Sequence, residues 1–152
     1  MLQSRESTIC LTIRNNRADL AMLSAALDRF GVEHGVPRES LVDLQVALDE
    51  IVSNVIKYAW PEGGTREVSV RMTARKDAVD IEVIDDGEAF NPLSVAPPKR
   101  SPGRKPRIGG VGIHMVKQLM DRVEYARTDG RNHMIFTKRC ILGVPPPIEE
   151  AR

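Results

Sequence analysis

Hydrophobic residues recur along this chain with two different periods, and the order of these periods constrains the fold more than any other feature. Alternation of apolar and polar residues is typical of half-buried strands, and apolar spacings of three and four are typical of amphipathic helices. Strands are predicted in residues 7–14, 68–72, 79–83, 123–127 and 133–139, and helices in residues 17–30, 37–59 and 109–120. This mixed order predicts an α+β layer rather than a regular βαβ array.

Local signals mark the ends of the predicted helices. Asn15 and Asn16 offer N-cap side chains for the first helix, and Gly31 and Gly35 are expected to end it. Pro37 suits the first turn of the second helix, because the amide hydrogen that proline lacks is not needed there.

Two other segments are expected to be irregular. Residues 91–108 combine many prolines with basic residues, so we expect a long loop inside the domain, of the kind that is usually a functional lid or disordered. Residues 142–152 contain three consecutive prolines and are expected to form a disordered tail after a single domain of residues 1–141. Turns between strands are predicted at residues 76–77 and 129–130, the latter an Asp-Gly pair.

Composition excludes several functional classes. The chain has 152 residues, of which 41% are hydrophobic and 4% aromatic, enough for one mainly aliphatic core. Its net charge of +1 provides no global attraction to nucleic acid or to a membrane surface. Cys10 and Cys140 lack CxxC spacing, which favours two reduced thiols. Because no signal-peptide pattern and no apolar run of roughly 20 residues is present, we expect a soluble, cytoplasmic protein that binds neither membrane nor, directly, nucleic acid.

The first motif with chemical potential lies on the second predicted helix. Residues four and seven apart share a helical face, so Glu50, Asn54 and Lys57 are expected to lie together beside the apolar stripe. A carboxylate can orient or deprotonate a hydroxyl, an amide oxygen suits magnesium that already holds phosphates, and a lysine can meet phosphate charge. Taken alone, the triplet is better explained as the solvated face of an amphipathic helix.

The second motif is the strand end Asp85-Asp86-Gly87. Because Val83 is expected to point to the core, alternation directs Asp85 inward and Asp86 outward. An inward carboxylate is costly unless it meets a donor, and the exocyclic amine of adenine is such a donor. Gly87 would let the backbone pass close to a ring. The alternative is a turn in which both aspartates cap backbone amides.

The third motif is the glycine run of residues 109–113 at a predicted helix start. Backbone amides at such a position point toward an anion, and glycines let phosphate approach closely. The run reads GGVGIH, so it is neither a Walker A loop nor GxGxxG. The alternative is a flexible junction between loop and helix.

The three motifs and the basic loop follow one another in an order that resembles the GHKL superfamily of ATP-binding proteins, shared by gyrase, Hsp90, histidine kinases and MutL. The resemblance covers residues 7–138 and implies a Bergerat-type two-layer sandwich, in which helices cover one face of a mixed or antiparallel sheet. It also implies that residues 91–108 are a mobile ATP lid. Glu50 and Asn54 match the N-box of that superfamily. Asp85-x-Gly87 matches its first glycine box, and Gly110-x-Gly112 matches its second.

Within that superfamily the chain is most similar to bacterial anti-sigma-factor serine-protein kinases. Phe90, followed by Asn-Pro, has the form of that family, whereas Tyr58 stands where members commonly have histidine. The resemblance implies a kinase that uses ATP and Mg²⁺ to phosphorylate a serine on a STAS-type anti-sigma-factor antagonist, that can sequester a sigma factor, and that forms a homodimer. With the residue chemistry above, it makes Glu50 catalytic and Asn54 the metal ligand, and it assigns ATP contacts to Asn54, Lys57, Asp85, Gly87, Phe90, Gly109, Gly110, Val111, Gly112 and Ile113.

Other functions fit part of the pattern. A nucleotide-gated module that sequesters a partner without transferring phosphate would use the same boxes but needs no carboxylate beside the metal. Slow ATP hydrolysis of the gyrase type would require an additional transducer domain. The spacing of His34, His114 and His133 relative to the cysteines does not predict a metal site.

Overall fold

The computed structural model describes residues 6–94 and 110–143, and its elements follow the predicted order. The strands are β1 (Ser7–Arg14), β2 (Glu67–Arg75), β3 (Ala78–Asp85), β4 (Arg122–Thr128) and β5 (Arg131–Arg139). The helices are α1 (Arg17–Glu33), α2 (Arg38–Tyr58) and α3 (Gly110–Leu119), and a short 3-10 turn, η1, spans Pro92–Ser94. The predicted α+β class is confirmed.

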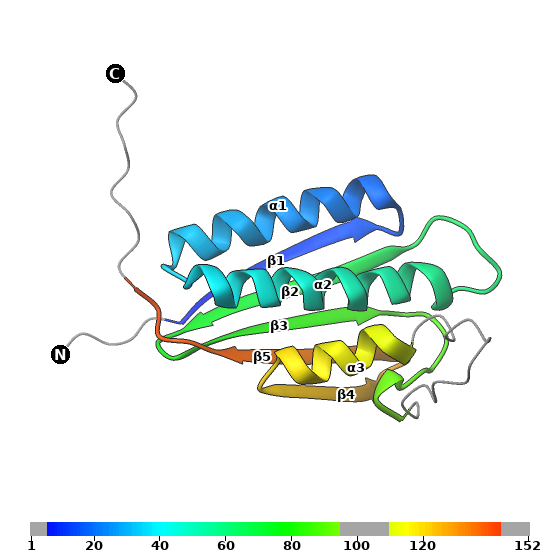
Figure 1. The fold of residues 1–152 in the computed structure, drawn as a ribbon. Helices are drawn as coiled ribbons and strands as arrows, with labels where there is room; N and C mark the ends of the chain where they lie inside the picture. Colours follow the sequence, from blue (N-terminus) through cyan, green and yellow to red (C-terminus); the bar gives the residue numbers. More distant parts are fainter. Residues whose placement is uncertain (1–5, 95–109, 144–152) are drawn as a thin grey trace, which may run out of the picture.

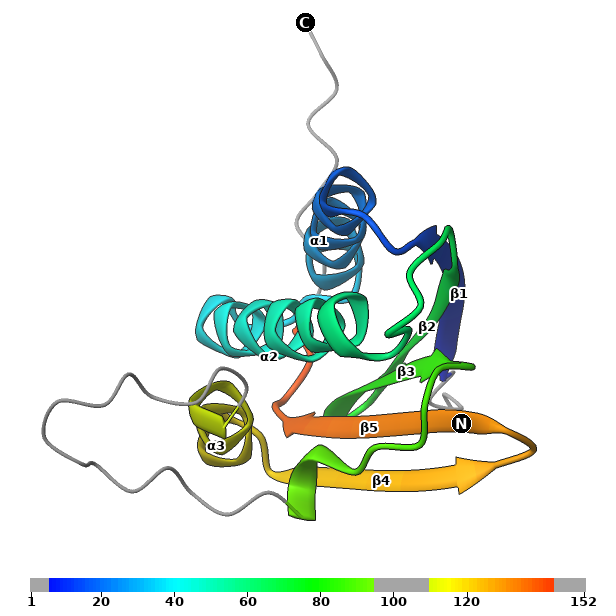
Figure 2. The same cartoon turned by 90° about the vertical axis from the view of Figure 1, so that its right-hand side faces the viewer.

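The strands form one sheet in the order β1-β2-β3-β5-β4, and each neighbouring pair is antiparallel. The three helices lie on one face of this sheet, as two perpendicular views show (Figure 1, Figure 2). The expected two-layer sandwich is therefore confirmed, with an antiparallel sheet among the described residues.

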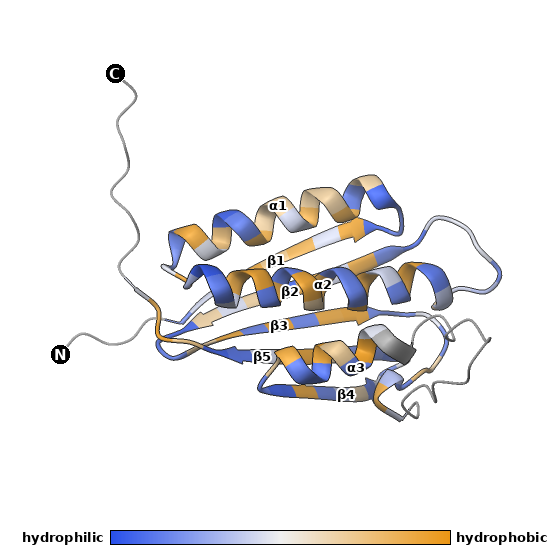
Figure 3. Ribbon diagram, viewed as in Figure 1, coloured by the Kyte–Doolittle hydropathy of each residue, from blue (hydrophilic) through white to orange (hydrophobic). Residues whose placement is uncertain are grey.

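Alternation along the central strands directs one set of side chains under the helices. Val79, Ile81 and Val83 of β3 are at most 1% exposed, and they share a core with Leu44 and Leu48 of α2. Figure 3 shows the corresponding alternation of apolar and polar residues along the chain. Each fully buried aliphatic side chain of this size stabilises the fold by about 1.5–3 kcal/mol, so the apolar face of α2 is tied firmly to the sheet.

The helix ends follow the sequence signals in part. The Asn16 side chain accepts a backbone N–H bond and caps α1, as predicted, and Gly35, with a φ of 65°, follows its last turn. The prediction that Gly31 ends α1 is wrong, because the helix continues to Glu33. Gly31 is buried, and an added Cβ would lie 2.7 Å from Leu41 Cδ1, so this glycine permits the close approach of α2. Pro37 is the N-cap of α2 rather than part of its first turn.

Both predicted hairpin turns are present. Residues 76–77 join β2 to β3, and Asp129 and Gly130 join β4 to β5 with φ values of 53° and 73°. Positive φ at both central residues suits the right-handed twist of the flanking strands.

The predicted lid and the predicted tail fall mostly on residues 95–109 and 144–152, which lie outside the described residues. Just before the tail, Gly143 N donates to Gly35 O at 2.8 Å, so the chain after β5 contacts the connection between α1 and α2. Among the described helices, none has the length and apolar character needed to cross a bilayer.

Candidate functional site

A cleft opens beside α2, next to the ends of β3 and β5 and the N-terminal part of α3. It contains about 470 Å³ of empty space, part of which is open to solvent, and is lined by Ile51, Asn54, Val55, Tyr58, Ala59, Asp85, Glu88, Phe90, Pro92, Ile113, Asn132 and Met134. Mostly apolar walls with a few polar groups are typical of small-molecule sites. Four of the predicted ligand residues meet here, namely Asn54, Asp85, Phe90 and Ile113.

Asp85 brings a carboxylate into the cleft at the end of β3. Asp85 is 5% exposed while Asp86 is exposed, which confirms the directions predicted from alternation. Asp85 Oδ1 accepts hydrogen bonds from Gly87 N at 2.9 Å and from Asn132 Nδ2 at 3.0 Å. The bond from Gly87 N is the contact expected if Asp85 only caps a backbone amide in a turn, but it involves only one of the two carboxylate oxygens. No donor within the described ranges reaches Oδ2, so this oxygen is available to a ligand.

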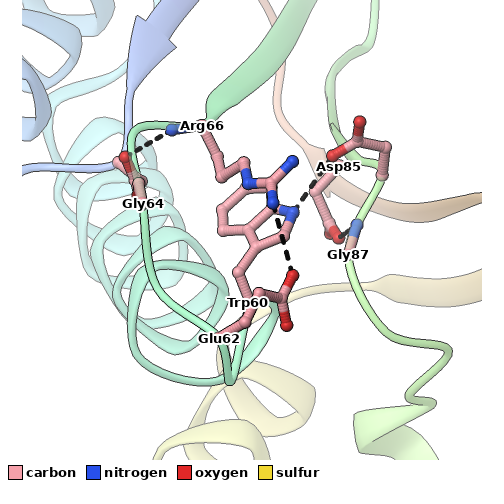
Figure 4. A network of polar contacts seen from close by, with 8 residues as sticks. Trp60, Glu62, Gly64, Arg66, Asp85 and Gly87 are labelled. Atoms are coloured by element: carbon pink, nitrogen blue, oxygen red, sulfur yellow. Dashed lines mark hydrogen bonds and ion pairs between the residues drawn. The ribbon is translucent and has the colours of Figure 1, made fainter.

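Gly87 is buried against the end of α2. Glu88 N donates to Ala59 O at 2.7 Å, and an added Cβ on Gly87 would overlap the same carbonyl group. The close approach that Gly87 permits is therefore made to protein backbone. Trp60 Nε1 donates to Asp86 Oδ1 at 3.1 Å and gives the strand end a second link to the residues after α2. Figure 4 shows Trp60 beside the strand end that carries Asp85 and Gly87. These contacts hold the end of β3 at a set distance from α2 and so determine the width of the cleft.

The predicted catalytic residue, Glu50, connects the first motif on α2 with the glycine run at the start of α3. Asn54 lines the cleft, and Glu50, one turn earlier on α2, reaches α3, where an added Cβ on Gly112 would overlap the Glu50 carboxylate. The absence of a side chain at Gly112 therefore lets the carboxylate lie against the start of α3. Lys57 is exposed and is not among the residues that line the cleft.

The glycine run begins α3, as predicted. Gly110 is the first residue of the helix, and Ile113 is 3% exposed and lines the cleft. Gly109 and the side chain of Val111 lie outside the described residues. Backbone amides of a helix start therefore lie near the Glu50 carboxylate and the cleft, which is the arrangement that favours anion binding.

The opposite end of α3 is anchored by a lysine. Lys138 Nζ donates to Leu119 O at 2.7 Å and pairs with Asp43 Oδ2 of α2 at 2.9 Å. A cation at the C-terminal end complements the helix dipole. This contact joins α2, α3 and β5, so it helps to orient the helix whose first residues approach the cleft.

Some residues of the cleft were not among the predicted ligand residues. Asn132 is 5% exposed and pairs with Asp85 across the antiparallel ladder of β3 and β5. Alternation in β5 carries a signal for it, because Asn132 stands two residues before the buried Met134. Tyr58, where the resemblance leads one to expect histidine, lines the cleft with 43% exposure. Glu88 also lines the cleft, but no pattern in the sequence indicates that it would.

Residues 13–138 match the family described as the histidine kinase-like ATPase domain. The chain is 28% identical over 107 residues to serine-protein kinase RsbW of Oceanobacillus iheyensis, a match that covers 67% of this chain and 65% of that protein. It is 30% identical over 102 residues to serine-protein kinase RsbW of Halalkalibacterium halodurans, covering 63% of this chain and 61% of the relative. It is 25% identical over 95 residues to serine/threonine-protein kinase BtrW of Bordetella bronchiseptica, covering 62% and 67%.

A solved structure, that of the RsbU and RsbW domains of Rv1364c from Mycobacterium tuberculosis, shares the fold with a TM-score of 0.62 at 16% identity. The similarity covers 90% of this chain and 32% of that one. The matched region spans 61% to 67% of the length of the three kinases above. The family match covers most of the chain, and the cleft is lined by Asn54 of α2, Asp85 at the end of β3 and Ile113 near the start of α3. The chain therefore belongs to the family of histidine kinase-like ATPase domains.

Proposed function

We propose that this chain is an ATP-dependent protein-serine kinase and anti-sigma factor. It transfers the γ-phosphoryl group of ATP to a serine of a STAS-type anti-sigma-factor antagonist, and as a cytoplasmic homodimer it can sequester a sigma factor. Similarity to proteins named serine-protein kinase supports the reaction. The observation that carries the proposal is the contact between Glu50 and Gly112, because it puts a carboxylate beside a glycine-rich helix start.

The cleft fits an adenine nucleotide, the ligand that the family implies. The apolar side chains of Ile51, Val55, Ile113 and Met134 can enclose a flat ring, and Asp85 Oδ2 can accept a hydrogen bond from its exocyclic amine. Asp85 Oδ2 receives no hydrogen bond from the described residues, which also supports a ligand donor at this position.

The phosphates are proposed to lie at residues 109–113, where backbone amides and the helix dipole favour anions. Asn54 would offer its amide oxygen to Mg²⁺, which neutralises phosphate charge when bound. Phe90, which lines the cleft and is 52% exposed, is proposed to cover the adenine ring. Gly87 is proposed to keep the end of β3 close to that ring. Lys57 is proposed to meet phosphate charge from the solvent side of α2.

Glu50 is the proposed general base. Its carboxylate accepts the proton of the attacking serine hydroxyl while the serine oxygen bonds to the γ-phosphorus. The bond between the γ-phosphorus and the bridging oxygen breaks, and its electron pair leaves on ADP. Glu50 then returns the proton to solvent.

The test incubates the purified chain with ATP, Mg²⁺ and the antagonist domain and measures serine phosphorylation by mass spectrometry. Glu50→Gln should lower the rate about 10²–10⁴-fold while ATP affinity stays within about twofold, because the base acts only on the hydroxyl. Asn54→Ala should lose both metal-dependent ATP affinity and activity. Asp49→Asn removes the neighbouring exposed carboxylate of α2 and should retain both.

A chain that binds the antagonist in the presence of ATP but never phosphorylates it would refute the kinase proposal. The alternative, a non-catalytic nucleotide-gated regulator that binds a partner, would then be the better account.

A further inference from the structure

Asn132, the second residue of β5, uses its whole hydrogen-bonding capacity inside the protein. Its Nδ2 donates to Asp85 Oδ1 at 3.0 Å and to Glu88 O at 2.8 Å. Its Oδ1 accepts from Tyr125 Oη at 2.6 Å and from Phe90 N at 3.4 Å. A side-chain amide has two donor hydrogens and two acceptor lone pairs, so nothing remains for a ligand, although Asn132 lines the cleft.

Only one orientation of this amide satisfies its neighbours. Rotating it by half a turn would set the NH₂ group against the Phe90 N–H and the carbonyl oxygen against the Asp85 carboxylate. Because Asn132 is 5% exposed, such mismatches could not be relieved by solvent. The donors of Asn132 are therefore committed to Asp85 and Glu88.

The consequence falls on the Asp85 carboxylate. Its Oδ1 accepts from both Gly87 N, just after β3, and Asn132 Nδ2 of β5, so one oxygen is held by two donors from separate parts of the chain. Fixing Oδ1 in this way fixes the rotation of the carboxylate group and hence the direction of Oδ2. The same asparagine holds the Glu88 carbonyl, so the segment that follows β3 is fixed together with the carboxylate.

We propose that Asn132 is a positioning residue for base recognition: it aims Asp85 Oδ2 at the exocyclic amine of the base without touching the base itself, and Tyr125 holds Asn132 in that role. This rests on the proposed function, in which Asp85 accepts from adenine. Base selectivity then depends on a hydrogen-bond relay from β4 through β5 to β3, and the nucleotide meets only its last member.

The test compares two ligands that differ only in the group that Asp85 reads. Dissociation constants for ATP and for purine riboside triphosphate, which lacks the exocyclic amine, are measured by calorimetry with Mg²⁺. The parent should bind ATP about 10- to 150-fold more tightly than the analogue, the range expected for one charge-assisted hydrogen bond. Asn132→Leu, which has a side chain of similar size, should weaken the binding of ATP but not of the analogue, since the analogue never used the contact. The two dissociation constants should then differ by less than about threefold.

Two further variants make the comparison specific. Tyr125→Phe removes one bond to Asn132 Oδ1 and leaves that from Phe90 N, so it should give an intermediate ratio in a less perturbed fold. This variant carries the test if Asn132→Leu does not fold, which circular dichroism and thermal unfolding would reveal. His133→Ala changes the next residue of β5, whose side chain pairs with Glu82 rather than lining the cleft, and should keep the parent ratio.

Three results would overturn the inference. If Asn132→Leu and Tyr125→Phe both keep the parent ratio, Asp85 does not need the relay. If Asn132→Leu lowers the affinities for ATP and for the analogue by the same factor, Asn132 supports only the fold. If the parent itself binds the two ligands equally, the adenine contact of the proposed function fails, and the inference fails with it.

Discussion

Replacing Asp85 by asparagine tests the adenine contact with an almost isosteric change. Because Asp85 Oδ1 receives bonds from Gly87 N and Asn132 Nδ2, the new side chain must turn its carbonyl oxygen toward these two donors. Its NH₂ group then occupies the position of Oδ2 and faces the cleft. There it would meet the exocyclic amine of adenine, so a donor would stand against a donor.

The expected loss can be worked out from these contacts. A hydrogen bond to a charged group contributes about 1.5–3 kcal/mol, which corresponds to a roughly 10- to 150-fold rise in the dissociation constant for ATP. Asp85→Asn should raise the dissociation constant for ATP by this factor, as measured by isothermal titration calorimetry. The fold should persist, because the asparagine oxygen retains both internal hydrogen bonds.

Asp86→Asn is the matched control. Its amide oxygen can still accept from Trp60 Nε1, and its side chain points away from the cleft, so ATP affinity should stay within about twofold of the parent. An Asp86 variant that loses more affinity than the Asp85 variant, or an Asp85 variant that loses none, would refute the assignment of the inward carboxylate to adenine.

Three more results are expected. Gly87→Ala should lower both the melting temperature and ATP affinity, since its Cβ would overlap the Ala59 carbonyl; unchanged thermal unfolding would contradict this. ATP with Mg²⁺ at a hundredfold excess over its dissociation constant should raise the unfolding free energy by about 2.7 kcal/mol, measured as an upward shift of the thermal melt; no shift would exclude binding to the folded state. Burial raises the pKa of the Cys140 thiol above its ordinary value of 9.0, so the native state retains a proton that the unfolded state releases, and stability from this group is lost as pH rises above about 9. Urea unfolding at pH 8 and pH 10 should therefore show a smaller decline for Cys140→Ser than for the parent, and equal declines would contradict the assignment.

Predictions that depended on local chemistry were reliable. Alternation and helical spacing predicted every strand and α-helix of the described residues, because the periods of a strand and of a helix determine which side chains reach the core. The 3-10 turn η1 was not predicted, since it lies in a proline-rich segment that was expected to be irregular. The same reasoning predicted the directions of Asp85 and Asp86. Gly31 shows the limit of local signals, since a glycine that ends a helix and a glycine that admits Leu41 from another helix look alike in the sequence.

What the sequence by itself determined, then, is the order of the elements, the antiparallel hairpins and the inward carboxylate at the end of β3. The tertiary structure alone decided which distant residues meet that carboxylate. Asn132 faces Asp85 because β5 pairs directly with β3 in the sheet, and Glu50 contacts Gly112 because α2 and α3 pack on the same face. Neither contact follows from spacing along the chain, because each depends on a register or a packing distance that is set only when the layers assemble.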